Sequence, residues 1–156
     1  MGKDQFLKIF AVIMFMALIL TPACKKDESC SIHPEAFRFS IIDTETDADL
    51  LETGVYSAED IGIHYFYNDT KQDLIINQEA NSGEGYTELF SAQLPMISLT
   101  RSEIFYLVLN PQETDTLVVL MGREKRDGCD FHPYAEVRHN GKNLAISEGE
   151  AFIIEK

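Results

Sequence analysis

Apolar and polar residues alternate in short runs along most of this chain, the pattern of strands that bury one face. In the run Ala36–Asp43, Phe37, Phe39 and Ile41 fall on one face and Arg38 falls on the other. Further β-rich runs cover Ile61–Tyr67, Asp73–Gln78, Met96–Leu99, Glu103–Leu109, Thr116–Met121, Tyr134–His139, Asn143–Ile146 and Ala151–Glu155. The pattern therefore predicts about eight or nine short strands.

Turn residues separate these runs. Asn68–Gln72 and Asn110–Gln112 are turn-prone, and Asn140-Gly141 is a strong signal for a two-residue hairpin. After residue 35 no apolar period of a helix lasts longer than two turns, and only Asp47–Thr53, ended by Gly54, is typical of a single helical turn. We therefore predict an antiparallel β-sandwich of about eight strands, immunoglobulin-like or transthyretin-like, with a small β-barrel as the alternative.

The first residues differ in kind from the rest. Lys3 and Lys8 precede Ile9–Leu20, an uncharged apolar run. As a helix this run is about 18 Å long, short of the roughly 30 Å needed to cross a bilayer. A positive start, a short apolar run and a small residue before a cleavage point indicate a signal peptide over residues 1–23.

The sequence Leu20-Thr21-Pro22-Ala23-Cys24 resembles the lipobox of bacterial lipoproteins. The resemblance implies that Cys24 is acylated and becomes the new N-terminus, so that its acyl chains hold the protein on a lipid bilayer. Thr21 and Pro22 depart from the family pattern, and cleavage after Ala23 by the ordinary signal peptidase stays open as an alternative.

The segment Cys24–Ser29 resembles the charged segment that follows the lipidated cysteine in small surface lipoproteins of the Bacteroidota. The resemblance implies an outer-membrane location with the protein exposed at the cell surface. The alternatives are the periplasmic face of that membrane and secretion. The chain then divides into a signal peptide (residues 1–23), a lipidated tether (24–35) and one folded domain (36–156).

The charge of the chain limits its partners. Its 156 residues include 13 Lys and Arg against 26 Asp and Glu, a formal charge of −13. Loss of residues 1–23 removes two lysines and one aspartate and makes the charge −14. Such acidity argues against nucleic acid and anionic membrane surfaces as partners. The protein or glycan partner stays unidentified at this stage.

Three cysteines are an odd number, and acylation of Cys24 leaves Cys30 and Cys129 as a pair. In an oxidising compartment the pair is expected to form a disulfide. The alternative is a zinc site, because each of the two cysteines begins the sequence Cys-x-x-His-Pro. Cys30, His33, Cys129 and His132 would then supply two thiolates and two imidazoles to one tetrahedral ion.

Acidic residues gather in one segment, where eight fall between Arg38 and Lys71 without a basic residue among them. Alternating carboxylates are what Ca²⁺ requires, and a calcium site is one interpretation of this loop. The segment lacks the EF-hand pattern. The other interpretation is a solvated connection between the first two strands. The four candidate calcium ligands are Asp43, Glu45, Asp47 and Asp49.

The sequence offers few residues for catalysis. The four histidines lie in no recognised motif, and neither a serine nucleophile elbow nor a Gly-rich phosphate loop is present. We therefore predict a non-enzymatic binding or structural module, with a calcium- or glycan-binding module and, further off, a small hydrolase as alternatives. A cofactor is not expected, apart from the Ca²⁺ considered above.

Two features bear on glycans. Several aromatic residues could form a sugar platform, although core packing accounts for most of them and tryptophan is absent. Asp115-Thr116-Leu117 resembles the O-glycosylation sequon of exported Bacteroidota proteins, which implies a glycan on Thr116. The candidate aromatics are Tyr65, Phe66, Tyr67, Tyr86, Phe90, Phe105 and Tyr106.

Overall fold

The computed structural model describes residue 30 and residues 32–79, 85–144 and 151–156. The predicted signal peptide, the acylation site Cys24 and the segment Lys25–Ser29 lie outside the described residues, as does the end of the predicted strand Asn143–Ile146. No helix in the described part of the chain is long and apolar enough to cross a membrane.

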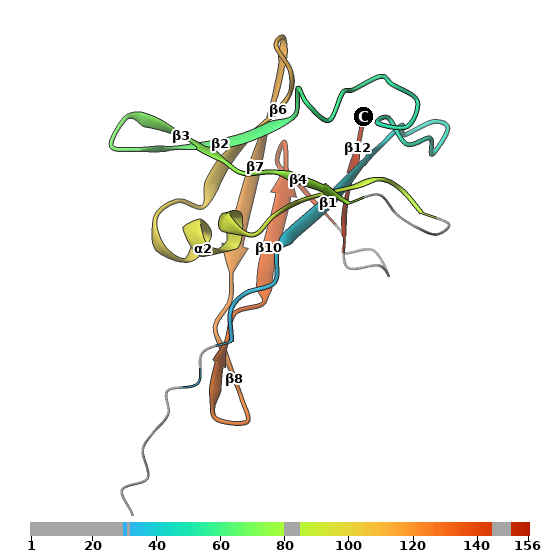
Figure 1. Cartoon of the computed structure of the whole chain (residues 1–156). Coiled ribbons are helices and arrows are strands. Elements are labelled where there is room, and N and C mark those ends of the chain that lie inside the picture. Colours follow the sequence, from blue (N-terminus) through green and yellow to red (C-terminus); the bar gives the residue numbers. More distant parts are fainter. Residues whose placement is uncertain (1–29, 31, 80–84, 145–150) are drawn as a thin grey trace, which may run out of the picture.

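The described residues form twelve strands and the short helix α2 (Gln93–Thr100) (Figure 1). The larger sheet has the order β11 (Lys142–Asn143), β10 (Tyr134–His139), β7 (Glu113–Met121), β6 (Ile104–Asn110), β2 (Gly62–Tyr67) and β3 (Thr70–Leu74). The smaller sheet has the order β12 (Phe152–Glu155), β1 (Phe37–Ile42), β5 (Glu88–Ser91) and β4 (Asn77–Glu79). β8 (Glu124–Arg126) and β9 (Cys129–Phe131) form a separate hairpin.

The predicted all-β sandwich is confirmed, and the sheets do not close into a barrel. Two details differ from the prediction. The described strands are more numerous than eight, because several are only two to four residues long. The pairing is also not wholly antiparallel, since β12 runs parallel to β1.

Alternating side chains of both sheets meet in one core. Phe37 and Phe39 of β1 are fully buried, as are Leu107 of β6 and Leu117 of β7. The ring of Phe37 stacks on that of Phe152, with 5.2 Å between the centroids. Each such buried side chain contributes about 1.5–3 kcal/mol to stability relative to an exposed one. The core thus holds the two sheets together.

The prediction of a strand at Met96–Leu99 is wrong, because these residues lie in α2. A run of four residues, three of them apolar, does not distinguish a strand from a buried helical turn. Pro95 stands in the first turn of the helix, where its missing N–H breaks no helical hydrogen bond. Ser98 is buried beside β7 and donates a hydrogen bond to the carbonyl oxygen of Val119, at 2.6 Å.

The first predicted hairpin is tighter than expected. Asn68 and Asp69 alone form the turn, with φ values of 49° and 59°. Positive φ at both residues is the geometry that matches the twist of a two-residue hairpin. β3 therefore begins at Thr70 and ends at Leu74, and the predicted strand Asp73–Gln78 is divided between the two sheets.

Other local predictions had mixed outcomes. The two-residue turn Asn140-Gly141 is confirmed between β10 and β11. A single turn closes in the predicted place, where Thr53 N donates to Asp49 O at 3.0 Å. The sequence did not predict β5 or the β8–β9 hairpin, whose strands are too short to show alternation.

Candidate functional site

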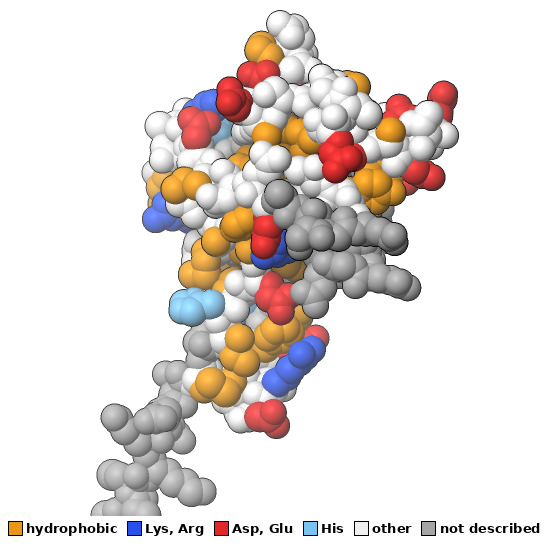
Figure 2. Space-filling model, turned by 45° about the vertical axis from the view of Figure 1, so that its right-hand side comes forward, with side chains coloured by type: hydrophobic (Ala, Val, Ile, Leu, Met, Phe, Trp, Pro, Cys, Tyr) orange, Lys and Arg blue, Asp and Glu red, His pale blue; other side chains and the backbone are white. Residues whose placement is uncertain are grey.

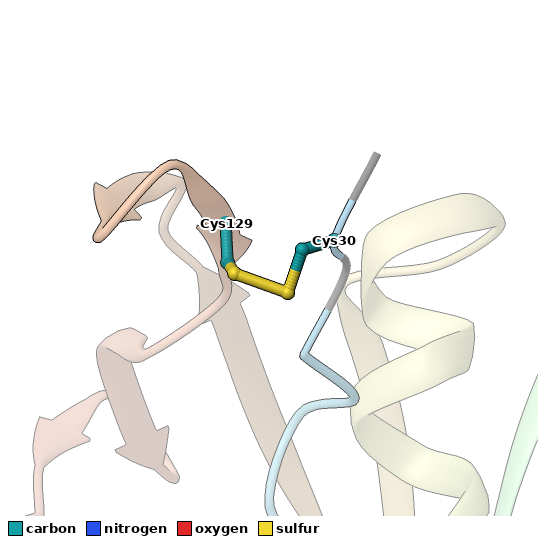
Figure 3. Close-up of a disulfide and its surroundings, with 2 residues drawn as sticks. All are labelled: Cys30 and Cys129. Atoms are coloured by element: carbon teal, nitrogen blue, oxygen red, sulfur yellow. A yellow bond between two sulfur atoms is a disulfide. The ribbon is translucent and has the colours of Figure 1, made fainter. Parts of the chain in front are cut away.

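Cys30 and Cys129 form the predicted disulfide, with 4.5 Å between their Cα atoms (Figure 3). Two backbone hydrogen bonds extend the junction: Ile32 N donates to Asp130 O at 3.0 Å, and Asp130 N donates to Cys30 O at 2.9 Å. The end of the predicted tether is therefore fastened to β9. Since the two sulfurs are bonded to each other, the zinc alternative lacks the two thiolates it requires.

The two histidines of the repeated Cys-x-x-His-Pro sequence take no part in a common site. His33 is exposed. His132 is partly buried, and its Nδ1 lies 3.2 Å from the carbonyl oxygen of Gly122. The two cysteines of the repeated sequence thus lie together, but its two histidines do not come together as metal ligands.

In the acidic loop, two of the four candidate calcium ligands accept hydrogen bonds from backbone amides of the loop itself. Asp43 Oδ1 accepts hydrogen bonds from the amides of Glu45 and Thr46, at 3.1 and 2.8 Å. Asp49 Oδ1 accepts from the amide of Leu51 at 2.8 Å, and Asp49 is buried. Within the described residues no three acidic, histidine or cysteine side chains converge as metal ligands. The structure therefore favours the interpretation of a connection between strands.

We expect millimolar Ca²⁺ to leave the melting temperature unchanged and to release no binding heat. The carboxylates of Asp43 and Asp49 already accept backbone hydrogen bonds, while Glu45 and Asp47 are not buried. Calorimetric titration and thermal melting with and without Ca²⁺ measure both quantities, and Mg²⁺ at equal ionic strength serves as the control. A saturable heat specific to Ca²⁺ would contradict the expectation.

A cluster of polar side chains lies at the end of the sandwich, where inward-facing positions of β7 and β10 change from apolar to polar. Asp115 follows the same face as buried Leu117, and His139 the same face as buried Val137. Asp115 and His139 are each 7% exposed. We call the group the Asp115 cluster, and its members are Tyr56, Glu113, Asp115, His139, Asn140 and Lys156.

Lys156, which follows β12, joins two carboxylates of β7. Its Nζ lies 2.6 Å from Glu113 Oε1 and 2.6 Å from Asp115 Oδ2. Asp115 also accepts hydrogen bonds from Asn140 Nδ2 and His139 Nε2, each at 2.8 Å. The ammonium group therefore links the smaller sheet to the larger one.

At neutral pH the side chains of Glu113, Asp115 and Lys156 are all ionised. Burial raises the pKa of Asp115, but the hydrogen bonds from Asn140, Lys156 and His139 outweigh burial and hold the pKa below its usual value. The hydrogen bond from Lys156 lowers the pKa of Glu113. Burial lowers the pKa of Lys156, but its hydrogen bonds to the two carboxylates raise it above its usual value.

A groove of about 790 Å³ lies beside the cluster and is lined by residues that include Tyr56, His139 and Lys142. Hydrolysis there would need a free acid or base next to a nucleophile. The cluster carboxylates Glu113 and Asp115 are both paired with Lys156, Glu155 is a further acid of the lining, and the described lining residues include no serine, threonine or cysteine. The contacts of Lys156 with Glu113 and Asp115 are suited to locking the two sheets together.

The candidate aromatic residues do not form one platform. Tyr65 and Phe105 are buried in the core, and Phe90 lies under the guanidinium of Arg38. Phe66 and Tyr106 lie on the outer face of the larger sheet, where the ring of His64 stacks on that of Tyr106 at 5.2 Å. His64 covers one face of the Tyr106 ring and the guanidinium of Arg101 lies over the Tyr67 ring, while Phe66 and Tyr67 remain 50% and 47% exposed.

Thr116, the predicted glycosylation site, lies within β7 opposite Tyr106. Its amide donates to Asn140 Oδ1 at 2.9 Å, and the residue is partly buried. Its neighbours Asp115 and Leu117 point into the domain. In the sequence Asp115 stood out only as part of this sequon, and its cluster was not predicted. One signal in the sequence could have pointed to the cluster: Asp115 is an acidic residue on the strand face that buries Leu117.

Charged side chains of both signs lie on the face of the domain that Figure 2 shows. On the visible face, acidic side chains are spread over several parts of the domain and basic ones are fewer (Figure 2). Comparisons with protein-family models, curated proteins and solved structures gave no match. The function therefore has to be argued from the chain itself.

Proposed function

We propose that this chain is a lipid-anchored outer-membrane lipoprotein whose domain acts as a non-enzymatic binding or structural module at the cell surface. The lipobox-like sequence ending at Cys24 and the charged segment Lys25–Ser29 support the anchor. The pairing of both cluster carboxylates with Lys156 supports the absence of acid–base chemistry.

The observation that carries the proposal is where the disulfide lies relative to Cys24. Cys30 is six positions after Cys24 and is bonded to Cys129. Six extended residues span at most about 21 Å, so acyl chains on Cys24 would hold the β8–β9 hairpin close to the bilayer. The end of β12 lies at the opposite end of the domain from β8 (Figure 1). That opposite end, with the Asp115 cluster and the acidic loop, would face outward.

We expect Cys24→Ala to move the protein from the membrane fraction to the soluble fraction. The thiol of Cys24 is the only group in the proposal to which the acyl chains attach, and loss of the chains removes about 0.8 kcal/mol of membrane affinity per buried CH₂. Ultracentrifugation followed by immunoblotting measures the distribution, and palmitate labelling measures the acylation itself. Protease treatment of intact cells tests exposure at the surface.

Thr21→Leu provides a matched control, because it brings the sequence nearer to the lipobox pattern and leaves Cys24 in place. This variant should remain in the membrane fraction and be labelled at least as well as the wild type. The anchor proposal fails if wild type and Cys24→Ala fractionate alike. Labelling with full resistance to protease in intact cells would place the protein on the periplasmic side instead.

A further inference from the structure

β3 forms one edge of the larger sheet. It pairs with β2 on one side, and no strand of the described chain pairs with it on the other. The β2–β3 hairpin projects from the body of the domain (Figure 1), so its outer edge is accessible. An unpaired strand edge is a row of hydrogen-bonding groups that another strand can complete.

The turn determines which backbone groups of β3 point outward. Tyr67 and Thr70 flank the two-residue turn and are paired, as are Tyr65 and Gln72. In an antiparallel ladder, residues that exchange hydrogen bonds alternate with residues that do not, and the pair closing a two-residue turn exchanges them. The N–H and C=O groups of Lys71 and Asp73 therefore point to the open edge.

These two residues also carry opposite charges on one face. Lys71 Nζ lies 2.8 Å from Asp73 Oδ1, and their side chains are 51% and 72% exposed. We propose that two copies of this chain pair antiparallel through β3, with Gln72 of each copy on the two-fold axis. In this register Lys71 lies opposite the partner's Asp73, and Asp73 lies opposite the partner's Lys71.

This register pairs the backbone hydrogen-bonding groups of the two edges and also places opposite charges across from each other. Lys71 and the partner's Asp73 exchange two backbone hydrogen bonds, and the symmetry repeats the pair. Opposite charges directly across a sheet stabilise the pairing. A lysine alone on an edge strand normally prevents pairing through repulsion. Asp73, two positions later, turns the edge into a self-complementary surface of the kind that a two-fold interface requires.

The inner side of the same edge is partly apolar. A groove of about 390 Å³ lies between β3 and α2, and its lining combines Leu74 and Ile97 with polar side chains that include Gln93 and Arg101. Met96 is 42% exposed there, and Ile75, just after β3, is 62% exposed. In the proposed register Leu74 lies opposite the partner's Thr70, and both grooves adjoin the interface. Burial of these side chains would add an apolar contribution to the backbone hydrogen bonds.

Charge reversal at the two positions tests the proposal. We expect the full chain, purified in a density-matched detergent, to show a concentration-dependent monomer–dimer equilibrium in analytical ultracentrifugation. Lys71→Glu and Asp73→Lys should each weaken the dimer about tenfold or more, because each places two symmetry-related like-charge pairs across the interface. An equimolar mixture of the two variants should form a heterodimer, because Glu then lies opposite Lys and Asp lies opposite Lys.

Native mass spectrometry of the mixture, with one variant labelled with ¹⁵N, identifies the heterodimer. Thermal melting of each variant, at a protein concentration where the wild type is monomeric, is the folding control, and it should match the wild type because both side chains are exposed. A monomeric wild type at all concentrations would overturn the proposal. So would dimers insensitive to both substitutions, or a mixture that stays monomeric. Because acylation is not needed for the dimer, failure of the anchor proposal would leave this result unchanged.

Discussion

Replacing Cys30 and Cys129 together by serine is expected to lower the free energy of unfolding by about 4 kcal/mol. The bond joins residues 99 positions apart and so restricts most of the unfolded domain. In the chain-entropy model a loop of this length gives up to about 4.7 kcal/mol. For a domain of this size the melting temperature should fall by more than about ten degrees.

Thermal melting of the double variant, followed by circular dichroism, measures the effect. Wild type in a strong reductant should melt with the double variant, and the reductant should not change the double variant further. This second arm separates the bond from any effect of serine at the two positions. Equal melting temperatures for oxidised and reduced wild type would show that the bond does not stabilise the domain.

The disulfide was predictable from the sequence, whereas its surroundings were not. The prediction rested on the number of cysteines and on the resemblance around Cys24, which implies an oxidising compartment. Neither predicted the two backbone hydrogen bonds next to the disulfide, in which Asp130 N donates to Cys30 O and Asp130 O accepts from Ile32 N. Those contacts depend on the β8–β9 hairpin, whose strands are too short for alternation to reveal.

Longer strands were predictable because their alternation covers enough positions. β1, β2 and β6 fall within or close to their predicted ranges. The short run Met96–Leu99, with three apolar residues, could not distinguish a strand from α2. The sequence also did not show that Asp73–Gln78 is divided between the two sheets, because this division follows from the tight turn at Asn68 and Asp69.

The Asp115 cluster could not be assembled from the sequence. Tyr56, Glu113, His139 and Lys156 are far apart along the chain and meet only after the sheets pack. The parallel pairing of β12 with β1 brings Lys156 to the cluster, and a parallel pairing gives no short-range signal comparable to a hairpin turn. The one local indication was that Asp115 shares a strand face with buried Leu117.

Asp115→Asn is expected to lower the free energy of unfolding by about 2–3 kcal/mol. The substitution keeps the shape of the side chain but leaves the buried ends of Lys156 and His139 without the carboxylate that accepts their hydrogen bonds. Removing one partner of a buried ion pair costs about 3–5 kcal/mol, and the loss here is expected to be smaller because Glu113 remains to pair with Lys156. Chemical denaturation measures the change. Glu52→Gln, at an exposed acid, is the matched control and should change stability by less than about 0.5 kcal/mol.

The same variant should alter the acid sensitivity of the domain. The pKa of Asp115 is lowered on folding, so its contribution is present above the unfolded pKa, near 4, and is lost as pH falls below that value. Glu113 follows the same sign. Wild type should therefore lose stability more steeply than Asp115→Asn as the pH falls below about 4. Equal slopes would show that the Asp115 carboxylate does not link folding to protonation.

A double-mutant cycle decides whether the cluster acts as one unit across the two sheets. Lys156→Met alone leaves Glu113 and Asp115 as neighbouring anions without their shared cation, and it should destabilise the domain by an amount similar to Asp115→Asn. Groups in one network show coupling energies of about 0.5–3 kcal/mol. The double variant should therefore lose less stability than the sum of the single losses. Strict additivity would mean that the 2.6 Å contact between Lys156 and Asp115 does not hold β12 to β7.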